Sequence, residues 1–331
     1  MQQVVYPIES VEPVVFMVEN QLLLKKKFST PIVAIDLMGC DVEPVAIAKS
    51  VMAAGFPFKY IFIVHESCKL PPCYEAHYAS EIFSEKDNPL EVARRKKTSL
   101  TMGVQLIAVG KADAFITAGD TGTLIASSRL YLETLLPSKK LALMTKLPTL
   151  KGQVLLGDLG ANIHVKAEDF LEFAKLGIAF LKASGIAHPK MGFLNIGQES
   201  TKGAPEWVKA YLLLQELSSK ENVIFHGNIE PCNLFTEDLQ LVITEALAGN
   251  ILLKTAEGVA KMVLKALKGS LEKPLWLDWS DYPGALLVGL KVPVIKVHGY
   301  STDKAFLSAI SSIKGLLKEK VIDKMADILR V

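Results

Sequence analysis

Two kinds of hydrophobic pattern alternate along the chain. Short apolar runs rich in β-branched residues are separated by longer segments in which apolar positions recur every three or four residues. The short runs predict strands, and because most are apolar on both faces, they are typical of strands buried between two helical layers. The expected strands are 31–36, 59–64, 113–118, 153–158, 190–196, 222–226, 239–244 and 292–297.

The longer segments predict the helices that lie between these strands. Regular alternation of strand and helix favours an α/β fold, a doubly wound α/β/α sandwich around a mostly parallel sheet. Residues 1–30 precede the first strong strand and are interpreted as an N-terminal extension, with 31–331 forming a single domain. The expected helices are 44–54, 89–110, 122–136, 167–184, 205–219, 250–270 and 302–318.

Composition narrows the class of protein. The 331 residues include 37 Lys and Arg against 35 Asp and Glu, so no global basic field indicates a nucleic-acid partner. None of the four cysteines forms a C-x-x-C pair, and the six histidines lack metal-ligand spacing, so we expect no metal site. Without a membrane-spanning run or a secretory pattern, the chain is expected to be a soluble cytoplasmic protein.

Polar and glycine-rich segments follow four of the predicted strands, where sheets of this class bind ligands. The segments are 36–44, 118–123, 158–166 and 244–254. Gly119 to Gly122 would bring backbone N–H groups at a helix start to an anion, although Asp120 and Thr121 could simply cap that helix. Neither a P-loop nor a dinucleotide fingerprint nor a G-x-S-x-G elbow occurs.

Two of these strand ends combine an amide with a cation. Asn162 and Lys166 follow Gly160, while Asn250 and Lys254 lie four residues apart on one helix face. Such groups suit a phosphate or an acyl oxyanion. The alternative is a capped amphipathic helix with a solvated lysine. The basic run 94–97 could likewise be a solvated face, a phosphate site or a docking face for an acidic partner.

Read together, these blocks resemble the phosphate acyltransferases of bacterial phospholipid synthesis, the PlsX family. The similarity covers about residues 31–318, in family order. Three departures stand out: Cys40 replaces a glycine, Asp120 replaces an asparagine, and Glu245 replaces an aspartate. The matching blocks are DLMGCDVEP (36–44), RRKKTS (94–99), AGDTGTLIA (118–126), GDLGAN (157–162), FLNIGQESTKG (193–203), HGNIE (226–230), GNILLKTAEG (249–258), PGALLVG (283–289) and VIKVHGYS (294–301).

The resemblance implies a phosphotransacetylase-like fold, of the isocitrate and isopropylmalate dehydrogenase-like superfold, and a homodimer without a cofactor. It implies transfer of a long-chain acyl group from acyl carrier protein to inorganic phosphate. The acyl-phosphate product would pass to a membrane glycerol-3-phosphate acyltransferase. The helical projection near 255–282 looks shorter than in relatives, which bears on membrane association. Localisation at the inner face of the cytoplasmic membrane is therefore left open beside a purely cytoplasmic one.

The same blocks assign candidate site residues. We expect Asn162 and Asn250 to donate to phosphate or oxyanion, Lys254 to supply charge, and Asp158, like Asp36, to orient loops and lysines rather than transfer protons. The catalytic candidates are thus Asn162, Asn250, Lys254 and Asp158. The phosphate or acyl-phosphate candidates are Gly119, Asp120, Thr121, Gly122, Lys96, Lys97, Ser99, Asp36 and Gly39.

An acidic carrier protein needs a basic face, and the sequence offers two. One is the run beginning at Arg94 and Arg95, and the other is the helix face bearing Lys261, Lys265 and Lys268, which could also contact anionic lipid. Two functions compete with the carrier-dependent transferase. One is a CoA-dependent phosphate acetyl- or butyryltransferase, and the other is a non-catalytic acyl or carrier-protein binder.

Overall fold

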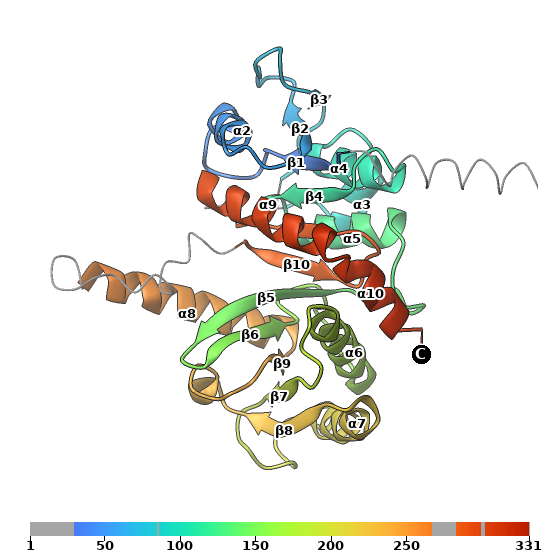
Figure 1. Cartoon of the computed structure of the whole chain (residues 1–331), viewed down its shortest axis with the longest axis vertical. Helices are drawn as coiled ribbons and strands as arrows, with labels where there is room; N and C mark the ends of the chain where they lie inside the picture. The colour runs from blue at the N-terminus through green and yellow to red at the C-terminus, as the bar shows by residue number, and fades with distance from the viewer. Residues whose placement is uncertain (1–29, 85, 267–282, 299–301, 331) are drawn as a thin grey trace, which may run out of the picture.

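A large sheet runs through the molecule (Figure 1). Among the described residues it has eleven strands, in the order β3-β2-β1-β4-β11-β10-β5-β6-β9-β7-β8. The computed structural model describes residues 30–84, 86–266, 283–298 and 302–330. The predicted N-terminal extension therefore lies outside the described residues, except for residue 30. The strands are β1 (Ile32–Asp36), β2 (Lys59–His65), β3 (Ala76–Ala79), β4 (Ala114–Thr117), β5 (Ala142–Thr149), β6 (Gly152–Gly157), β7 (Lys190–Leu194), β8 (Ile224–Ile229), β9 (Leu241–Ile243), β10 (Ala285–Val288) and β11 (Val294–Lys296).

The sheet consists of two parallel blocks that run in opposite directions. In the first block, β3, β2, β1, β4 and β11 pair in parallel, and in the second β6, β9, β7 and β8 do so. Between them β10 and β5 are antiparallel to both of their neighbours. This confirms the mostly parallel α/β fold. The antiparallel centre differs from the prediction, because neither β5 nor β10 was expected.

Helices cover both faces of the sheet, which gives the three-layer sandwich. Alternate residues of β4 show the two faces: Phe115 packs against α4 and α5, whereas Ile116 packs against α2 and α9. On the face that α2 and α9 cover in the first block, the second block is covered by α6, α7 and α10. The helices are α2 (Pro44–Ala53), α3 (Pro89–Arg94), α4 (Ser99–Ala108), α5 (Thr121–Tyr131), α6 (Ala167–Ala183), α7 (Pro205–Glu221), α8 (Ala246–Ala266), α9 (Asp303–Lys318) and α10 (Val321–Ile328), with a short 3₁₀ turn η1 (Pro231–Asn233).

The predicted helix 89–110 is wrong as a single element. Arg95 leaves the helical region with φ −72° and ψ 127°, which ends α3. Thr98 then caps α4 by accepting a hydrogen bond from the Thr101 N–H at 3.3 Å, and it forms a parallel bridge with Glu81. The basic run 94–97 therefore begins at the last residue of α3 and continues along the connection beside the end of β3, rather than forming a helix face.

Candidate functional site

A cavity of about 530 Å³ lies along the carboxyl ends of the five strands of the first parallel block. Each strand contributes its last residue or the loop that follows, and α8 closes the cavity with Lys254. Sheets of this class bind ligands at such an edge. The lining residues are Asp36, Met38, Gly39, Asp41, His65, Ala79, Glu81, Ile82, Phe83, Ser99, Ala118, Gly119, Asp120, Thr121, Lys254, Lys296 and His298.

Two glycine-containing loops meet at the centre of this cavity. Gly39 has φ +81°, and a Cβ there would lie 3.0 Å from the Gly119 Cα, so the loops touch backbone to backbone. The Gly119 N–H donates to Thr117 Oγ1 (2.9 Å), and that hydroxyl donates to Asp36 Oδ2 (2.8 Å). Asp36 therefore holds both loops, since it also accepts from the Met38 N–H at 3.0 Å. Burial raises the pKa of this carboxyl to about 6.

The loop after β4 leads directly into α5. Asp120 caps this helix by accepting from the Thr123 N–H at 2.7 Å, so the structural role considered for it is present. Its side chain and that of Thr121 also line the cavity. Gly122 does not line it, because the space beside its Cα is occupied by Pro89 of α3. The first free N–H groups of α5 thus lie at the cavity wall.

Positive charge gathers at the β11 end of the cavity. Lys254 Nζ lies 2.9 Å from Glu257 Oε2, and His298 Nε2 lies 3.1 Å from Glu257 Oε1. Lys254 Nζ also lies 2.9 Å from His298 Nδ1. Burial would raise the pKa of Glu257, but the hydrogen bonds from His298 and Lys254 outweigh it and hold that pKa below its usual value. Glu257 therefore positions both side chains at the cavity.

Lys296 contributes a second ammonium group to the same cavity. Its Nζ donates to the Val297 carbonyl at 3.1 Å, and within the described part of the chain no carboxylate oxygen lies within 4.0 Å of it. Burial lowers the pKa of Lys296 to about 8; nearby Asp120 acts in the opposite direction, and Lys254 adds to the lowering. Lys254 and Lys296 thus bring two ammonium groups from different parts of the chain to one cavity.

The loop after β6 is held by a buried hydrogen-bond network centred on Asp158. Asp158 is fully buried and accepts hydrogen bonds from the N–H groups of Leu143, Ala161 and Asn162 at 2.8–3.0 Å. The Asn162 amide donates to Asp158 Oδ2 and to the Leu141 carbonyl, both at 2.8 Å. Both amide hydrogens are therefore used within the protein. The prediction that Asn162 donates to phosphate or oxyanion does not fit this geometry, which is that of a loop-positioning residue.

Arg129 completes this buried network by donating to Asn162 Oδ1 at 2.7 Å. The loop nevertheless approaches the cavity, since a Cβ on Gly160 would lie 3.9 Å from Thr121 Cγ2. Asp158 orients the loop through its hydrogen bonds, as proposed for this carboxylate from the sequence, and it does not line the cavity.

The remaining predicted residues lie at the surface. Asn250, Lys96 and Lys97 are exposed and do not line the cavity. Arg94 is exposed, and Arg95 is ion-paired with Asp87 at 3.2 Å. Lys261 and Lys265 are exposed on α8, and Lys268 lies outside the described residues. The cavity therefore brings together only part of the predicted set: Asp36, Gly39, Ser99, Gly119, Asp120, Thr121 and Lys254.

Sequence reasoning missed Lys296, His298 and Glu257 as site residues. All three occur in blocks that carry the resemblance, and Lys296 ends a strand just as Asp36 does. Period-two spacing of a lysine and a histidine at a strand end was the available signal, because it places both on one side of the chain. Their meeting with Glu257 depends on α8 crossing to the first block, which spacing does not show.

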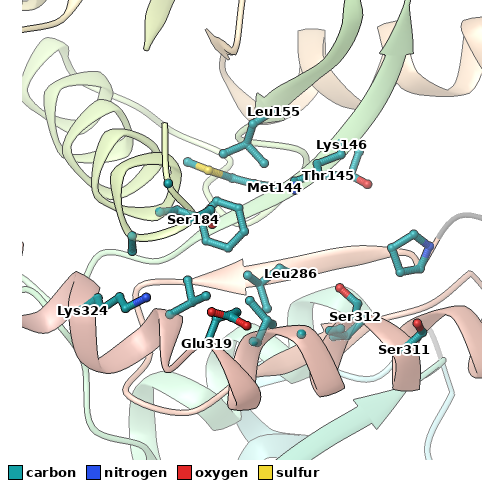
Figure 2. A pocket seen from close by; sticks show the side chains of 18 of the residues that line it. Met144, Thr145, Lys146, Leu155, Ser184, Leu286, Ser311, Ser312, Glu319 and Lys324 are labelled. Carbon is teal, nitrogen blue, oxygen red and sulfur yellow. The ribbon is translucent and has the colours of Figure 1, made fainter. Parts of the chain in front are cut away.

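A second cavity of about 540 Å³ lies on the face of the sheet covered by α6, α9 and α10, with β5 and α6 on one side of it and β10, α9 and α10 on the other (Figure 2). Ile295 lines this cavity, whereas its neighbour Lys296 lines the first one. Met144, Leu155 and Leu286 give the second cavity an apolar floor. It contains none of the predicted site residues, so we take the first cavity as the candidate active site.

Two other structural features are absent from the described residues. Among the described residues, no group of three or more His, Cys, Asp or Glu side chains is arranged to hold a metal ion. No helix in that part of the chain has both the length and the apolar character needed to span a membrane.

Comparisons with known proteins give a consistent family. The family model described as "Fatty acid synthesis protein" matches residues 32–324. A phosphate acyltransferase of Chlamydia felis is 32% identical over 310 residues, covering 88% of this chain and 97% of that protein. A phosphate acyltransferase of Thermotoga maritima is 33% identical over 314 residues, covering 88% and 95%.

Solved structures agree on the fold. The phosphotransacetylase EutD from Staphylococcus aureus superposes with a TM-score of 0.56 at 18% identity, covering 91% of this chain and 99% of its own. A branched-chain phosphotransacylase from Enterococcus faecalis gives 0.55 at 16% identity, covering 87% and 99%. At these identities the likeness establishes the α/β/α architecture.

Proposed function

Since this chain belongs to the fatty acid synthesis protein family of phosphate acyltransferases, we propose that it transfers a long-chain acyl group from acyl carrier protein to inorganic phosphate. The observation that carries the proposal is the convergence of Lys254 and Lys296 on one cavity with the glycine loops 36–39 and 118–121. Two ammonium groups beside free backbone N–H groups form a site for a doubly charged oxyanion. The product would be an acyl-phosphate for phospholipid synthesis.

The reaction requires positioning more than acid–base chemistry. A phosphate oxygen attacks the thioester carbonyl, a C–O bond forms, and the tetrahedral intermediate collapses with loss of the thiolate. A thiol with an ordinary pKa near 8.5 leaves readily, so strong acid assistance is unnecessary. Holding phosphate beside the thioester supplies about 7–11 kcal/mol when the geometry is good. Donors preorganised for the oxyanion add about 3–4 kcal/mol each.

Individual residues take roles that follow from their positions. Lys254 and Lys296 bind phosphate, and Glu257 and His298 hold Lys254 in place. The N–H groups of Asp120 and Thr121, at the start of α5, are the oxyanion donors that replace the side chain of Asn162 in this account. Ser99 and Gly39 complete the wall. No cofactor takes part in this scheme.

The homodimer that we propose rests on an exposed apolar stripe of α8. Four side chains along α8, Leu247, Ile251, Val259 and Met262, are each between 50% and 67% exposed and fall in one sector of the helix. A second copy of the chain covering this stripe would give a homodimer. We propose a cytoplasmic enzyme that meets the membrane peripherally, where a glycerol-3-phosphate acyltransferase would consume its product.

The donor is tested by following thioester loss from palmitoyl-carrier protein with and without inorganic phosphate, beside palmitoyl-CoA. Phosphate-dependent release of carrier thiol with palmitoyl-CoA inert is the expected result. Preference for the CoA thioester would replace the proposal with a CoA-dependent phosphate acyltransferase. Folded protein that binds the carrier yet releases thiol from neither donor would be a non-catalytic binder.

A further inference from the structure

The residues that line the candidate cavity follow the order of the strands in the sheet, so the cavity forms an elongated path. Its lining runs from Ala79 at the end of β3, through His65 at the end of β2, Asp36 at the end of β1 with Met38 in the loop that follows, and Ala118 to Thr121 after β4, to Lys296 at the end of β11. These five strands are consecutive neighbours in the sheet and all parallel. With about 4.8 Å between neighbouring strands, the path extends for about 19 Å along the sheet edge.

The two ends of the path differ in chemistry. The β11 end carries Lys254, Lys296 and His298, where phosphate is proposed to bind. The other end opens at the edge strand β3, with Ile82 68% exposed. Immediately beside that opening lies the basic run: the Glu81 N–H donates to the Lys97 carbonyl at 3.1 Å, and Glu81 bridges to Thr98.

The lining between these ends fits an amphipathic linear chain better than a hydrocarbon one. Met38, Ala79 and Phe83 are apolar, but Asp41, His65 and Glu81 alternate with them. A fatty acyl chain packed here would remove those polar groups from water without giving them hydrogen-bond partners. A pantetheine-type arm, whose amides and hydroxyl alternate with short apolar stretches, satisfies both kinds of lining over a path of this length.

The positive charges at the opening are complementary to an acidic protein to which such an arm is attached. Arg94, Lys96 and Lys97 are exposed there, and Asp87 pairs with Arg95, leaving the other three cations available. An acidic protein attached to the arm would meet this positive surface as the arm enters, and exposed charges of this kind raise association rates.

We propose that the path from β3 to β11 is the channel for the donor's pantetheine arm, with Arg94, Lys96 and Lys97 as the docking surface for the acidic carrier protein at its opening. The inference rests on the proposed function for the identity of the donor. The carrier protein would thus dock at the basic run 94–97 rather than on the lysines of α8, and Ile82, Phe83 and His65 would contact the arm.

Binding measurements test this path without requiring turnover. Wild-type protein should bind holo-carrier protein, which bears the arm, more tightly than apo-carrier protein, which lacks it. Ile82→Trp should remove that difference while leaving apo-carrier binding unchanged, because the indole fills the opening. Val109→Trp is the matched control, since Val109 is equally exposed (67%) at the far end of α4.

Charge reversal tests the docking surface. The triple variant Arg94→Glu, Lys96→Glu, Lys97→Glu should weaken binding of both carrier forms by at least about tenfold, which corresponds to about 1.4 kcal/mol. The double variant Lys261→Glu, Lys265→Glu, on the competing face of α8, should bind both forms as the wild type does. Weakening by the α8 variant alone, or an unchanged holo-carrier preference in Ile82→Trp, would overturn the inference.

The outcome also separates this inference from the proposed function. If the wild-type protein binds the carrier and releases its thiol with phosphate, but neither set of variants changes carrier binding, the proposed path is wrong and the proposed reaction stands. Failure of wild-type protein to bind either carrier form overturns both. With a truncated acyl thioester that lacks most of the arm, Ile82→Trp should retain wild-type turnover, whereas a residue of the phosphate site would not.

Discussion

Lys296 is a buried cation whose charge is supported only from a distance, by Asp120, and no carboxylate in the described part of the chain lies within ion-pair distance of it. Within the described residues, its nearest acceptor is the Val297 carbonyl, and Lys254 repels it across the cavity. Burial of this ammonium beside a second one favours an anion in the cavity, and in the proposed site phosphate would supply the negative charge nearest to Lys296. We therefore expect Lys296 to contribute to anion binding and not to the stability of the fold.

The charge on Lys296 predicts a pH dependence for phosphate use. Its pKa of about 8 lies below the ordinary value of 10.5, so the ammonium is present below pH 8 and is lost as the pH rises through 8. The KM for phosphate should therefore rise above pH 8 in the wild type. In Lys296→Arg the charge persists, and the rise should be absent. An identical pH profile for the two proteins would remove Lys296 from the phosphate site.

The same shift has an opposite consequence for stability. Between pH 8 and 10.5 the unfolded chain holds more protons at this lysine than the folded one, so this group makes the free energy of unfolding increase with pH across that window. Lys296→Met removes the buried charge and should be more stable than the wild type at pH 7, as measured by urea unfolding.

Glu257 is a positioning residue whose removal should affect phosphate more than folding. Glu257→Gln loses the charge that holds Lys254 and His298, so the KM for phosphate should rise about tenfold, the scale of one charge-assisted hydrogen bond. The Tm should change little. Glu216→Gln, which breaks a comparable pair with Lys220 on α7, is the control and should leave the KM unchanged. Equal effects of the two variants would deny Glu257 its role.

Some site residues could be predicted from sequence and others could not. Gly119 and Lys254, which line the candidate cavity, could be singled out because a strand end and a helix face are local patterns. Lys296 and Glu257 were missed, since their role arises only where β11 and α8 approach in space. Asn162 was assigned a donor role because sequence shows an amide at a strand end but not the Asp158 carboxylate that occupies it.

At the scale of elements, the start of α5 combines a structural and a chemical function. Asp120 caps the helix through the Thr123 N–H, yet its charge lies in the cavity proposed for phosphate. An asparagine would cap equally well, because its side-chain oxygen accepts the same hydrogen bond. If phosphate binds here as proposed, the aspartate would lower its affinity, and the helix cap does not require a charged residue.

Asp120→Asn should accordingly keep stability and improve phosphate binding. We expect an unchanged Tm and a KM for phosphate lowered by about threefold to tenfold, from removing one like charge near the anion. Asp120→Ala, which also loses the cap, should lower the stability by about 1 kcal/mol and separates the two functions. A higher KM in Asp120→Asn would show that the carboxylate assists the reaction.

Element boundaries were predictable where polar caps and apolar periodicity agreed. Helices α2, α6 and α9 end within one or two residues of the prediction. The segment 89–110 was misassigned because its apolar periodicity continues through Arg95, while the break comes from the bridge between Thr98 and Glu81, a tertiary contact.

At the scale of the whole molecule, β5 and β10 join two parallel blocks into one sheet. We propose on this basis that 31–331 acts as a single domain, although part of the predicted projection near 255–282 lies outside the described residues. The antiparallel centre was not predictable, because β5 contains Lys146 and Pro148 within its apolar run and β10 has four residues. Figure 1 shows β10 and β5 crossing between the two blocks.

The exposed apolar stripe of α8 predicts the oligomeric state. Met262→Glu introduces a charge into the proposed interface and should convert a dimer into a monomer in sedimentation velocity. Leu212→Glu, at a similarly exposed site (60%) on α7, is the control and should remain dimeric. A wild-type monomer, or a dimer unaffected by Met262→Glu, would place the interface elsewhere.

The central claim is that Lys254 and Lys296 bind the phosphate that attacks the thioester. The most direct measurement traps acyl-phosphate with hydroxylamine while phosphate is titrated, using palmitoyl-carrier protein with the wild type, Lys254→Met and Lys296→Met. The account predicts saturable acyl-phosphate formation in the wild type and a strongly raised KM for phosphate in each folded variant. Wild-type kinetics in both variants would contradict it, because phosphate would then bind outside this cavity.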